Sequence, residues 1–417
     1  MILYYWLIWI LPLIQHPIWG LQIGPLTVVE YLGIACLLYS VVHVFVREKI
    51  PHFFASREVR LFMILYCLAI LSFLIGSKGL AADHSAFIVY TSSLFLVLIT
   101  IAVVDSLDRL RLTVFALIGS YAFASLYVIR EWQVNRAMGI FTRPGWVVLD
   151  SNYFATAAIY AMALAICLFQ GKRAWWEKAY CLGCLLVIIV ATTLCASRGG
   201  FLGLMAACIL IVWRTQNRVR NLLLVTVLVL PLSLILPISP LHRFIDQKDA
   251  DLGSTQAHLD AWNAGFEMIE AHPLLGVGLG NFKPMMPRYV PAGTNTDTLA
   301  HNMFIEVAAE LGLPALFIFV AIYYSCFRTL GKLSRDLALP DLFREAAAGL
   351  QAGILGVALA GCFVSAEYQK TTWMGFALAV CLVPLAQSLK AKAPEQVTLR
   401  TLGERSAEAV PVAQFHS

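Results

Sequence analysis

Apolar runs alternate with short polar segments along almost the whole chain, and one polar segment is much longer than the others. Because a helix needs about 20 apolar residues to cross a bilayer, the pattern predicts about twelve transmembrane helices. The first run has no basic segment before it and no clear cleavage site, so we interpret it as a retained helix and not as a signal peptide. The expected spans are 2–16, 25–46, 59–76, 86–104, 109–128, 152–170, 178–195, 198–213, 220–238, 303–326, 348–366 and 371–389.

The spans and the long polar segment divide the chain into four parts. Residues 1–238 hold the first nine helices, 239–302 form one large loop, 303–390 hold the last three helices, and 391–417 are a polar tail predicted to be disordered. Within the loop, four apolar residues share one face of a helix expected over 257–271: Leu259, Trp262, Phe266 and Ile269. That spacing predicts an amphipathic helix in the membrane interface.

Composition places the chain among membrane proteins. Hydrophobic residues make up 60% of it and charged residues only 13%, with a mean hydropathy of +0.76. A soluble domain would carry charges at about a quarter of its positions. The expected fold is therefore an all-α integral membrane protein with one large outer loop, and the twelve spans leave little chain for a soluble domain.

The distribution of charge predicts the orientation. Most of the 30 Lys and Arg residues fall in the loops after even-numbered spans and in the tail, which by the positive-inside rule face the cytoplasm. Both termini are then cytoplasmic, and loop 239–302 faces outward. The net charge of +5 follows from this asymmetry and does not indicate nucleic-acid binding.

Ser197 and Arg198 open the eighth expected span at its outer end. Ser197 is a good helix N-cap, and Gly199 and Gly200 leave the first-turn amides open to close approach. A helix N-terminus attracts phosphate, and a guanidinium adds bidentate pairing. The alternative is an interfacial arginine that extends to the lipid headgroups.

His301 and Asn302 close the loop directly before the tenth expected span. The positive end of a helix disfavours an imidazolium, so His301 should be neutral near pH 7 and able to accept a proton as a general base. Asn302 is placed to orient the ring or to bind a sugar hydroxyl. The alternative is a histidine that only caps the helix.

Other features of the large loop, and of the outer loop before the sixth span, allow two interpretations each. The glycines at 276, 278 and 280 fit either a phosphate site or, with no strand before them, a tight turn. The arginines at 130, 136, 143, 243 and 288 fit either a pyrophosphate site or separate solvated charges. Asp249 and Asp251 have the spacing of a metal-binding pair but also fit an exposed turn, and we predict no metal site.

Several of these segments together resemble the O-antigen ligase family. The resemblance rests on Ser197–Gly200, Trp262, the run His272–Gly278, Ala300–Asn302 with Glu306, and Glu310–Gly312, and it extends to Arg136–Phe141 and Asp150–Asn152. The family includes lipopolysaccharide O-antigen ligases, O-antigen polymerases and bacterial protein O-oligosaccharyltransferases. These motifs are specific to the superfamily but not to the acceptor.

The resemblance implies metal-independent glycosyl transfer at the periplasmic face of a bacterial inner membrane, without a cofactor. The donor would be a glycan on undecaprenyl pyrophosphate and the acceptor lipid A–core, among membrane lipids. Arg198 would bind the pyrophosphate and His301 would activate the acceptor hydroxyl, with inversion at the anomeric carbon as our hypothesis.

One position departs from the family. Members commonly carry arginine four residues before the loop tryptophan, where this chain has His258. A protonated His258 could pair with phosphate, or Arg243 or Arg288 could replace the missing arginine. The expected substrate-binding residues are His258, Arg243, Arg288, Asn302, Trp262 and Arg136.

Other functions remain open at this stage. A polymerase of repeat units and a protein O-oligosaccharyltransferase would share the same active groups and differ in the acceptor. A twelve-span transporter or flippase would call for two related halves and charges in mid-span. The halves of this chain look unlike, and its outer charges gather at one face.

Overall fold

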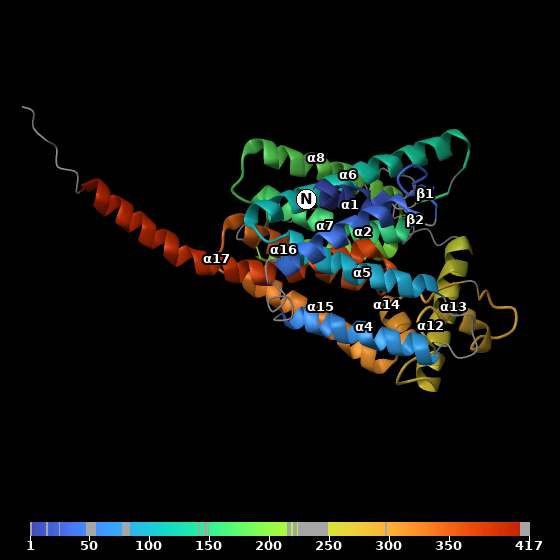
Figure 1. Cartoon of the computed structure of the whole chain (residues 1–417). Coiled ribbons are helices and arrows are strands. Elements are labelled where there is room, and N and C mark those ends of the chain that lie inside the picture. The colour runs from blue at the N-terminus through green and yellow to red at the C-terminus, as the bar shows by residue number, and fades with distance from the viewer. Residues whose placement is uncertain are drawn as a thin grey trace, which may run out of the picture.

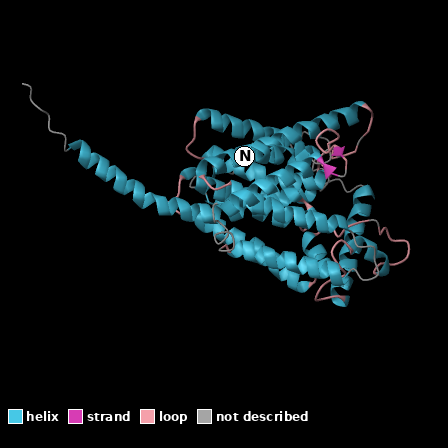
Figure 2. Ribbon diagram, viewed as in Figure 1, coloured by secondary structure: helices cyan, strands magenta, loops and turns pink. Residues whose placement is uncertain are grey.

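The computed structural model is a bundle of helices with a single short hairpin among the residues that it describes (Figures 1 and 2). Those residues are 2–13, 16–24, 26–46, 56–76, 84–140, 142–145, 148, 150–214, 218–219, 223, 249–296 and 298–408. Long apolar helices dominate because a chain in lipid must satisfy its backbone hydrogen bonds within each segment.

The elements follow one another with short connections. The first half contains α1 (Ile2–Ile10), η1 (Leu11–Leu13), β1 (Gln22–Ile23), β2 (Leu26–Thr27), α2 (Val28–Val46), α4 (Arg57–Gly76), α5 (His84–Val103), α6 (Leu107–Ala137), α7 (Ser151–Gln170), α8 (Trp175–Leu194) and α9 (Arg198–Arg214). The second half contains α12 (Asp249–Ala271), α13 (Phe282–Met285), η2 (Met286–Arg288), α14 (Met303–Leu311), α15 (Leu313–Leu333), α16 (Asp341–Ala360), η3 (Ala366–Tyr368) and α17 (Lys370–Glu408).

Eight described helices are long and apolar enough to cross a membrane: Arg57–Gly76, Ser85–Val103, Leu107–Ala137, Ser151–Gln170, Trp175–Leu194, Leu313–Leu333, Asp341–Ala360 and Lys370–Ala391. They make the chain a multi-pass membrane protein. The first two expected spans are shorter apolar helices, Ile2–Leu13 and Val28–Val42, and the eighth is the 17-residue α9. The ninth, 220–238, lies almost entirely outside the described residues, so the expected number of twelve stays a prediction.

The centre of the bundle is built from α7, α9 and α16, where small residues let backbones approach closely. A Cβ atom on Gly203 of α9 would lie 2.4 Å from the carbonyl oxygen of Gly356 on α16, and one on Gly353 would lie 2.5 Å from the ring of Tyr160 on α7. Small residues at helix contacts are the usual way to bring membrane helices together. This packing fixes the start of α9 beside the start of α7 and the end of α16.

The two ends of the bundle differ in character. Helices α12 and α13 and the β1–β2 hairpin lie at one end, and the last turns of α17 project from the other (Figure 1). Residues 391–408 continue α17 as a helix, where composition predicted a disordered tail. Most residues of that stretch, such as Ala, Glu, Gln, Leu and Arg, are good helix formers, which composition-based reasoning about disorder does not weigh.

The tenth expected span, 303–326, was wrong at its start. The chain forms two helices there, α14 and α15, which meet at Gly312 with φ +87°. A helix cannot continue through that conformation, and a Cβ on Gly312 would lie 2.3 Å from the carbonyl oxygen of Leu274. The span is therefore Leu313–Leu333, and α14 belongs to the same end of the bundle as α12.

Helix α12 contains the expected amphipathic segment, but its buried face is rotated from the predicted one. Ala261, Ala264 and Met268 are fully buried against α13 and α14, whereas Leu259 and Phe266 are 45% and 51% exposed. Trp262 and Ile269, the other members of the predicted face, are partly buried against the same cluster. The small side chains of Ala261 and Ala264 allow α12 to lie close to α14.

Candidate active site

A cavity of about 380 Å³ lies where the ends of α7, α9 and α16 meet α12. It contains three of the predicted catalytic and substrate-binding residues, namely Arg198, His258 and Trp262. Its full lining is Arg143, Asn152, Thr156, Ser197, Arg198, Gly199, Gly200, Leu202, His258, Leu259, Trp262, Ala360, Phe363 and Val364. Residues more than 200 positions apart therefore meet at the end of the bundle that α12 covers.

Arg198 is the first residue of α9, and its position is set by the expected cap. The Ser197 hydroxyl accepts a hydrogen bond from the Gly200 amide at 3.2 Å, which confirms Ser197 as the N-cap. The two glycines serve packing: a Cβ on Gly199 would lie 2.8 Å from Phe363, and one on Gly200 would lie 2.8 Å from Ala155. The start of α9 is thereby pressed against its neighbours with Arg198 at the cavity.

His301 lies in a tight bend directly before α14. Its ring centroid lies 4.8 Å from that of His258, at an interplanar angle of 58°. Burial lowers the pKa of His301 below its ordinary value, and the negative charge of Asp150 partly opposes this shift. The neutral imidazole expected from the sequence is thus favoured, although burial and not the helix terminus is the main cause.

The bend that carries His301 is held on both sides. The indole N–H of Trp262 donates to the carbonyl oxygen of Ala300 at 3.0 Å. The side-chain oxygen of Asn302 accepts from the amides of Phe304 and Ile305 at 3.0 and 3.2 Å, so Asn302 is the N-cap of α14. Because its oxygen is occupied, only its amide nitrogen is left to contact a sugar.

Backbone strain is concentrated beside the two predicted catalytic residues. Among the described non-glycine residues, only Ala196 and His301 have positive φ, each +49°. Such residues cost about 1–2 kcal/mol and persist where the surroundings hold them. Arg198, two residues after Ala196, lines the cavity, and the His301 ring lies against His258 of the same lining.

Among the outer arginines, Arg143 is one that the sequence did not identify as a site residue. It lines the cavity, and its Nη1 atom donates to the side-chain oxygen of Asn152 at 3.1 Å. Asp150 caps α7 by accepting from the Asn152 amide at 2.7 Å, which sets the orientation of this corner. Two guanidinium groups, Arg143 and Arg198, therefore line one cavity, a natural receptor for a doubly charged anion.

Three other predicted arginines are not brought to this cavity. Arg136 is exposed on α6, with its guanidinium 5.4 Å from the ring of Trp132. Arg288 is exposed at the end of η2 and is absent from the cavity lining. Arg243 lies outside the described residues. Among the described residues, Arg143 and not Arg288 lines the cavity with Arg198 and His258.

Residues 182–320 match the family described as O-Antigen ligase. This segment is similar to the O-antigen ligase family. The match covers Arg198, His258, Trp262 and His301, and it confirms the family resemblance drawn from the sequence motifs. No curated protein matches the chain at a significant level.

The glycine-rich turn of the O-antigen ligase segment is structural. Gly276, Gly278 and Gly280 have φ values of +66°, +106° and +78°. The amides of Gly280 and Phe282 donate to the Glu310 carboxylate at 3.1 and 3.0 Å. Because these two amides already donate to Glu310, they favour the interpretation of a tight turn over that of a phosphate site. The same hydrogen bonds connect the start of α13 to α14.

Buried carboxyl groups lie on α14 and η3. Glu306 and Glu367 are 0% and 1% exposed, and the Ser365 hydroxyl donates to Glu306. Burial raises the pKa of both, and the nearby charges of Glu367 and Glu310 raise the pKa of Glu306 further. These groups therefore favour the protonated form.

A second cavity, of about 470 Å³, has in its lining a residue of the segment that leads to His301. Leu299 lines it, together with Lys283, Lys370 and Glu310. Apolar residues of α5 and α7, including Val89 and Ala157, form much of the remaining wall. Leu299 thus lines the second cavity, and the His301 ring two residues later lies against His258 of the first.

Proposed function

We propose that the protein is a membrane glycosyltransferase that moves a glycan from undecaprenyl pyrophosphate to a lipid A–core acceptor at the periplasmic face of a bacterial inner membrane. The observation that carries the proposal is the joint cavity of Arg198 and Arg143, with a neutral His301 beside it. Anion binding and proton removal are the two functions that transfer from a pyrophosphate requires.

The arginines bind and stabilise the leaving group. A guanidinium pairs with phosphate through two parallel hydrogen bonds, and two of them meet the charge that develops on pyrophosphate as the glycosidic bond breaks. The positive end of α9 adds to the same field. The proposed reaction is metal-independent because these groups supply the positive charge.

His301 acts as the general base. Its neutral ring takes the proton of the acceptor hydroxyl while the acceptor oxygen bonds to the anomeric carbon, and the pyrophosphate leaves with the electron pair of the broken C–O bond. Attack from the face opposite the leaving group inverts the anomeric configuration. His258, with its ring against His301, orients the base and faces the donor cavity.

The acceptor enters from the second cavity. Leu299 belongs to that cavity and His301 follows two residues later, so a hydroxyl presented there can reach the base. Lys283 and Lys370 favour an acceptor that carries negative charge, as the phosphorylated lipid A–core does. A polymerase of lipid-linked repeat units is the second candidate, since a pyrophosphate-linked acceptor would meet the same two lysines.

The test is the glycolipid profile of a deletion strain, complemented by the wild-type gene or by His301→Ala. Loss of capped lipid A–core with long lipid-linked polymer accumulating would support the ligase. Accumulation of single repeat units, still transferred to core, would support the polymerase. A normal profile with His301→Ala as the only copy would rule out His301 as the base.

A further inference from the structure

A cavity of about 550 Å³, lined by both charged and apolar residues, lies at the end of the bundle opposite the candidate active site. It is formed by the ends of α7 and α9, the turn that follows α15, and the start of α16. Its lining is Cys167, Gln170, Gly171, Leu210, Ile211, Trp213, Arg214, Ser334, Arg335, Asp341, Arg344, Glu345, Ala348 and Ala352. The proposed glycosyl transfer makes no use of it.

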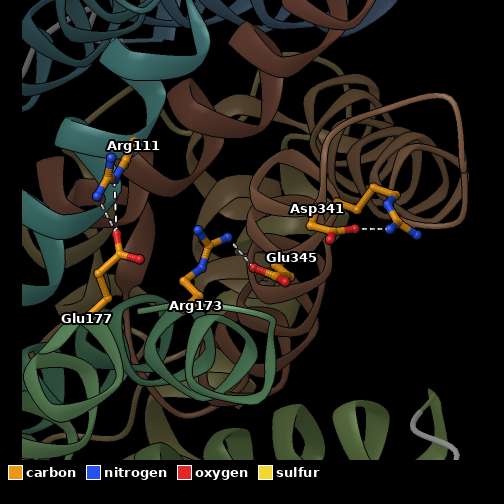
Figure 3. A network of polar contacts seen from close by, with 6 residues as sticks. Arg111, Arg173, Glu177, Asp341 and Glu345 are labelled. Atoms are coloured by element: carbon orange, nitrogen blue, oxygen red, sulfur yellow. Dashed lines mark hydrogen bonds and ion pairs between the residues drawn. The ribbon is translucent and has the colours of Figure 1, made fainter. Parts of the chain in front are cut away.

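The carboxylates that line this cavity already have cationic partners (Figure 3). Glu345 pairs with Arg173, and Asp341 pairs with Arg344. Beside them, Arg111 pairs with Glu177 at 2.6 Å. The two carboxylates of the lining therefore pair with arginines other than Arg214 and Arg335.

Arg214 and Arg335 line the cavity without a carboxylate partner among the described residues. Arg214 donates to the Ser334 hydroxyl at 3.1 Å, while its buried Nε atom has no hydrogen-bond partner in the described part of the chain. The like charges of the two arginines disfavour each other. An anion between them would remove that repulsion and satisfy their free donors.

The rest of the lining points to a lipid and not to a soluble anion. Leu210, Ile211, Ala348 and Ala352 give the cavity an apolar wall. Trp213 is 68% exposed, and the guanidinium of Arg218 lies 5.3 Å from its ring. An exposed tryptophan next to basic residues is typical of the membrane–water boundary, where phosphate headgroups lie above acyl chains.

We propose that Arg214 and Arg335 bind the phosphate headgroup of an anionic phospholipid at this end of the bundle. The acyl chains lie along the apolar wall, and the phosphate joins the end of α9 to the turn between α15 and α16. The opposite end of α9 carries Arg198. The proposal does not depend on the proposed glycosyl transfer, and its test measures lipid binding.

Purified full-length protein is stripped of lipid in detergent and mixed with phosphatidylglycerol, phosphatidylcholine or inorganic phosphate. Binding is followed by native mass spectrometry and by the thermal unfolding midpoint. Phosphatidylglycerol should bind and raise the midpoint, and phosphatidylcholine should bind at least about tenfold more weakly, because it lacks net charge. An equal response to both lipids, or the same stabilisation by inorganic phosphate alone, would overturn the proposal.

Arg214→Gln with Arg335→Gln should weaken phosphatidylglycerol binding about tenfold or more, since charge-assisted hydrogen bonds are lost. Arg328→Gln is the matched control, because Arg328 lies exposed on α15, outside the cavity, with its partner Tyr324. Arg335→Gln alone alters only an exposed side chain and serves if the double variant does not fold. Unchanged lipid selectivity in Arg335→Gln would refute the site.

Discussion

At the scale of single residues, the environment of His301 dictates how transfer should depend on pH. Burial lowers its pKa below the ordinary value of 6.5, so the neutral base persists into mildly acidic solution. The rate should stay constant from about pH 8 to about pH 6.5 and fall only as the pH drops through the lowered pKa. Initial rates of transfer across that range check the expectation.

Asp150→Asn sharpens this test. The Asp150 carboxylate raises the pKa of His301, so removing its charge should move the acid limb of the profile to still lower pH. Asparagine is as good an N-cap as aspartate, so α7 should keep its start. An acid limb that moves to higher pH would show that another group controls the rate.

Arg198→Lys probes the guanidinium fork. Lysine keeps the charge but cannot pair with phosphate through two parallel bonds, so kcat/KM should fall by about 100-fold or more. The measurement is the rate of transfer at saturating and limiting donor, with membrane insertion checked separately. Activity close to that of the wild type would mean that Arg198 only anchors α9 at the interface.

Arg143→Gln and Arg288→Gln form a matched pair. Arg143 lines the 380 Å³ cavity with Arg198, whereas Arg288 is exposed outside that cavity. Donor binding should weaken about tenfold or more in the first variant, because a charge-assisted pair is lost, and should be unchanged in the second. The reverse result would locate the second phosphate contact at η2.

At the scale of elements, the site depends on how turns hold short helices together. Gly276→Ala should lower the thermal unfolding midpoint by several degrees, since φ is +66° and the new Cβ would lie 2.2 Å from the Glu310 carbonyl carbon. Gly139→Ala is the control, with φ +73° but no atom within 4 Å. A similar loss in both variants would mean that only backbone strain matters.

At the scale of the whole molecule, the orientation of the bundle can be tested directly. By the positive-inside rule, the end with α12 should face the periplasm and the end with the 550 Å³ cavity the cytoplasm. Ala292 and Lys172 are exposed at these two ends. Single cysteines placed there, with the exposed Cys67 replaced by serine, report accessibility to an impermeant maleimide in intact spheroplasts.

We expect the maleimide to label the cysteine at position 292 in intact spheroplasts. The cysteine at position 172 should be labelled only after the membrane is broken. The opposite pattern would put the Arg198 cavity in the cytoplasm and contradict transfer from an outward-facing donor. Equal labelling at both positions would contradict the multi-pass arrangement itself.

Hydrophobic patterning predicted most long helices to within a few residues. The expected span 152–170 became Ser151–Gln170, and 59–76 became Arg57–Gly76. Apolar length is a local property, so it can be read without knowing the partner helices. The break at Gly312 could not be predicted in this way, because it depends on the backbone of Leu274, which lies against Gly312.

The sequence by itself determined a membrane-embedded helical chain, the cap at Ser197 and the residues of the ligase motifs. Only the tertiary structure decided that Arg143 joins Arg198, that the His258 and His301 rings meet, and that Glu367 is buried. Caps and apolar lengths are encoded within a few neighbouring residues. The site depends on the close packing of α7, α9 and α16, through which residues far apart in the chain meet at one end of the bundle.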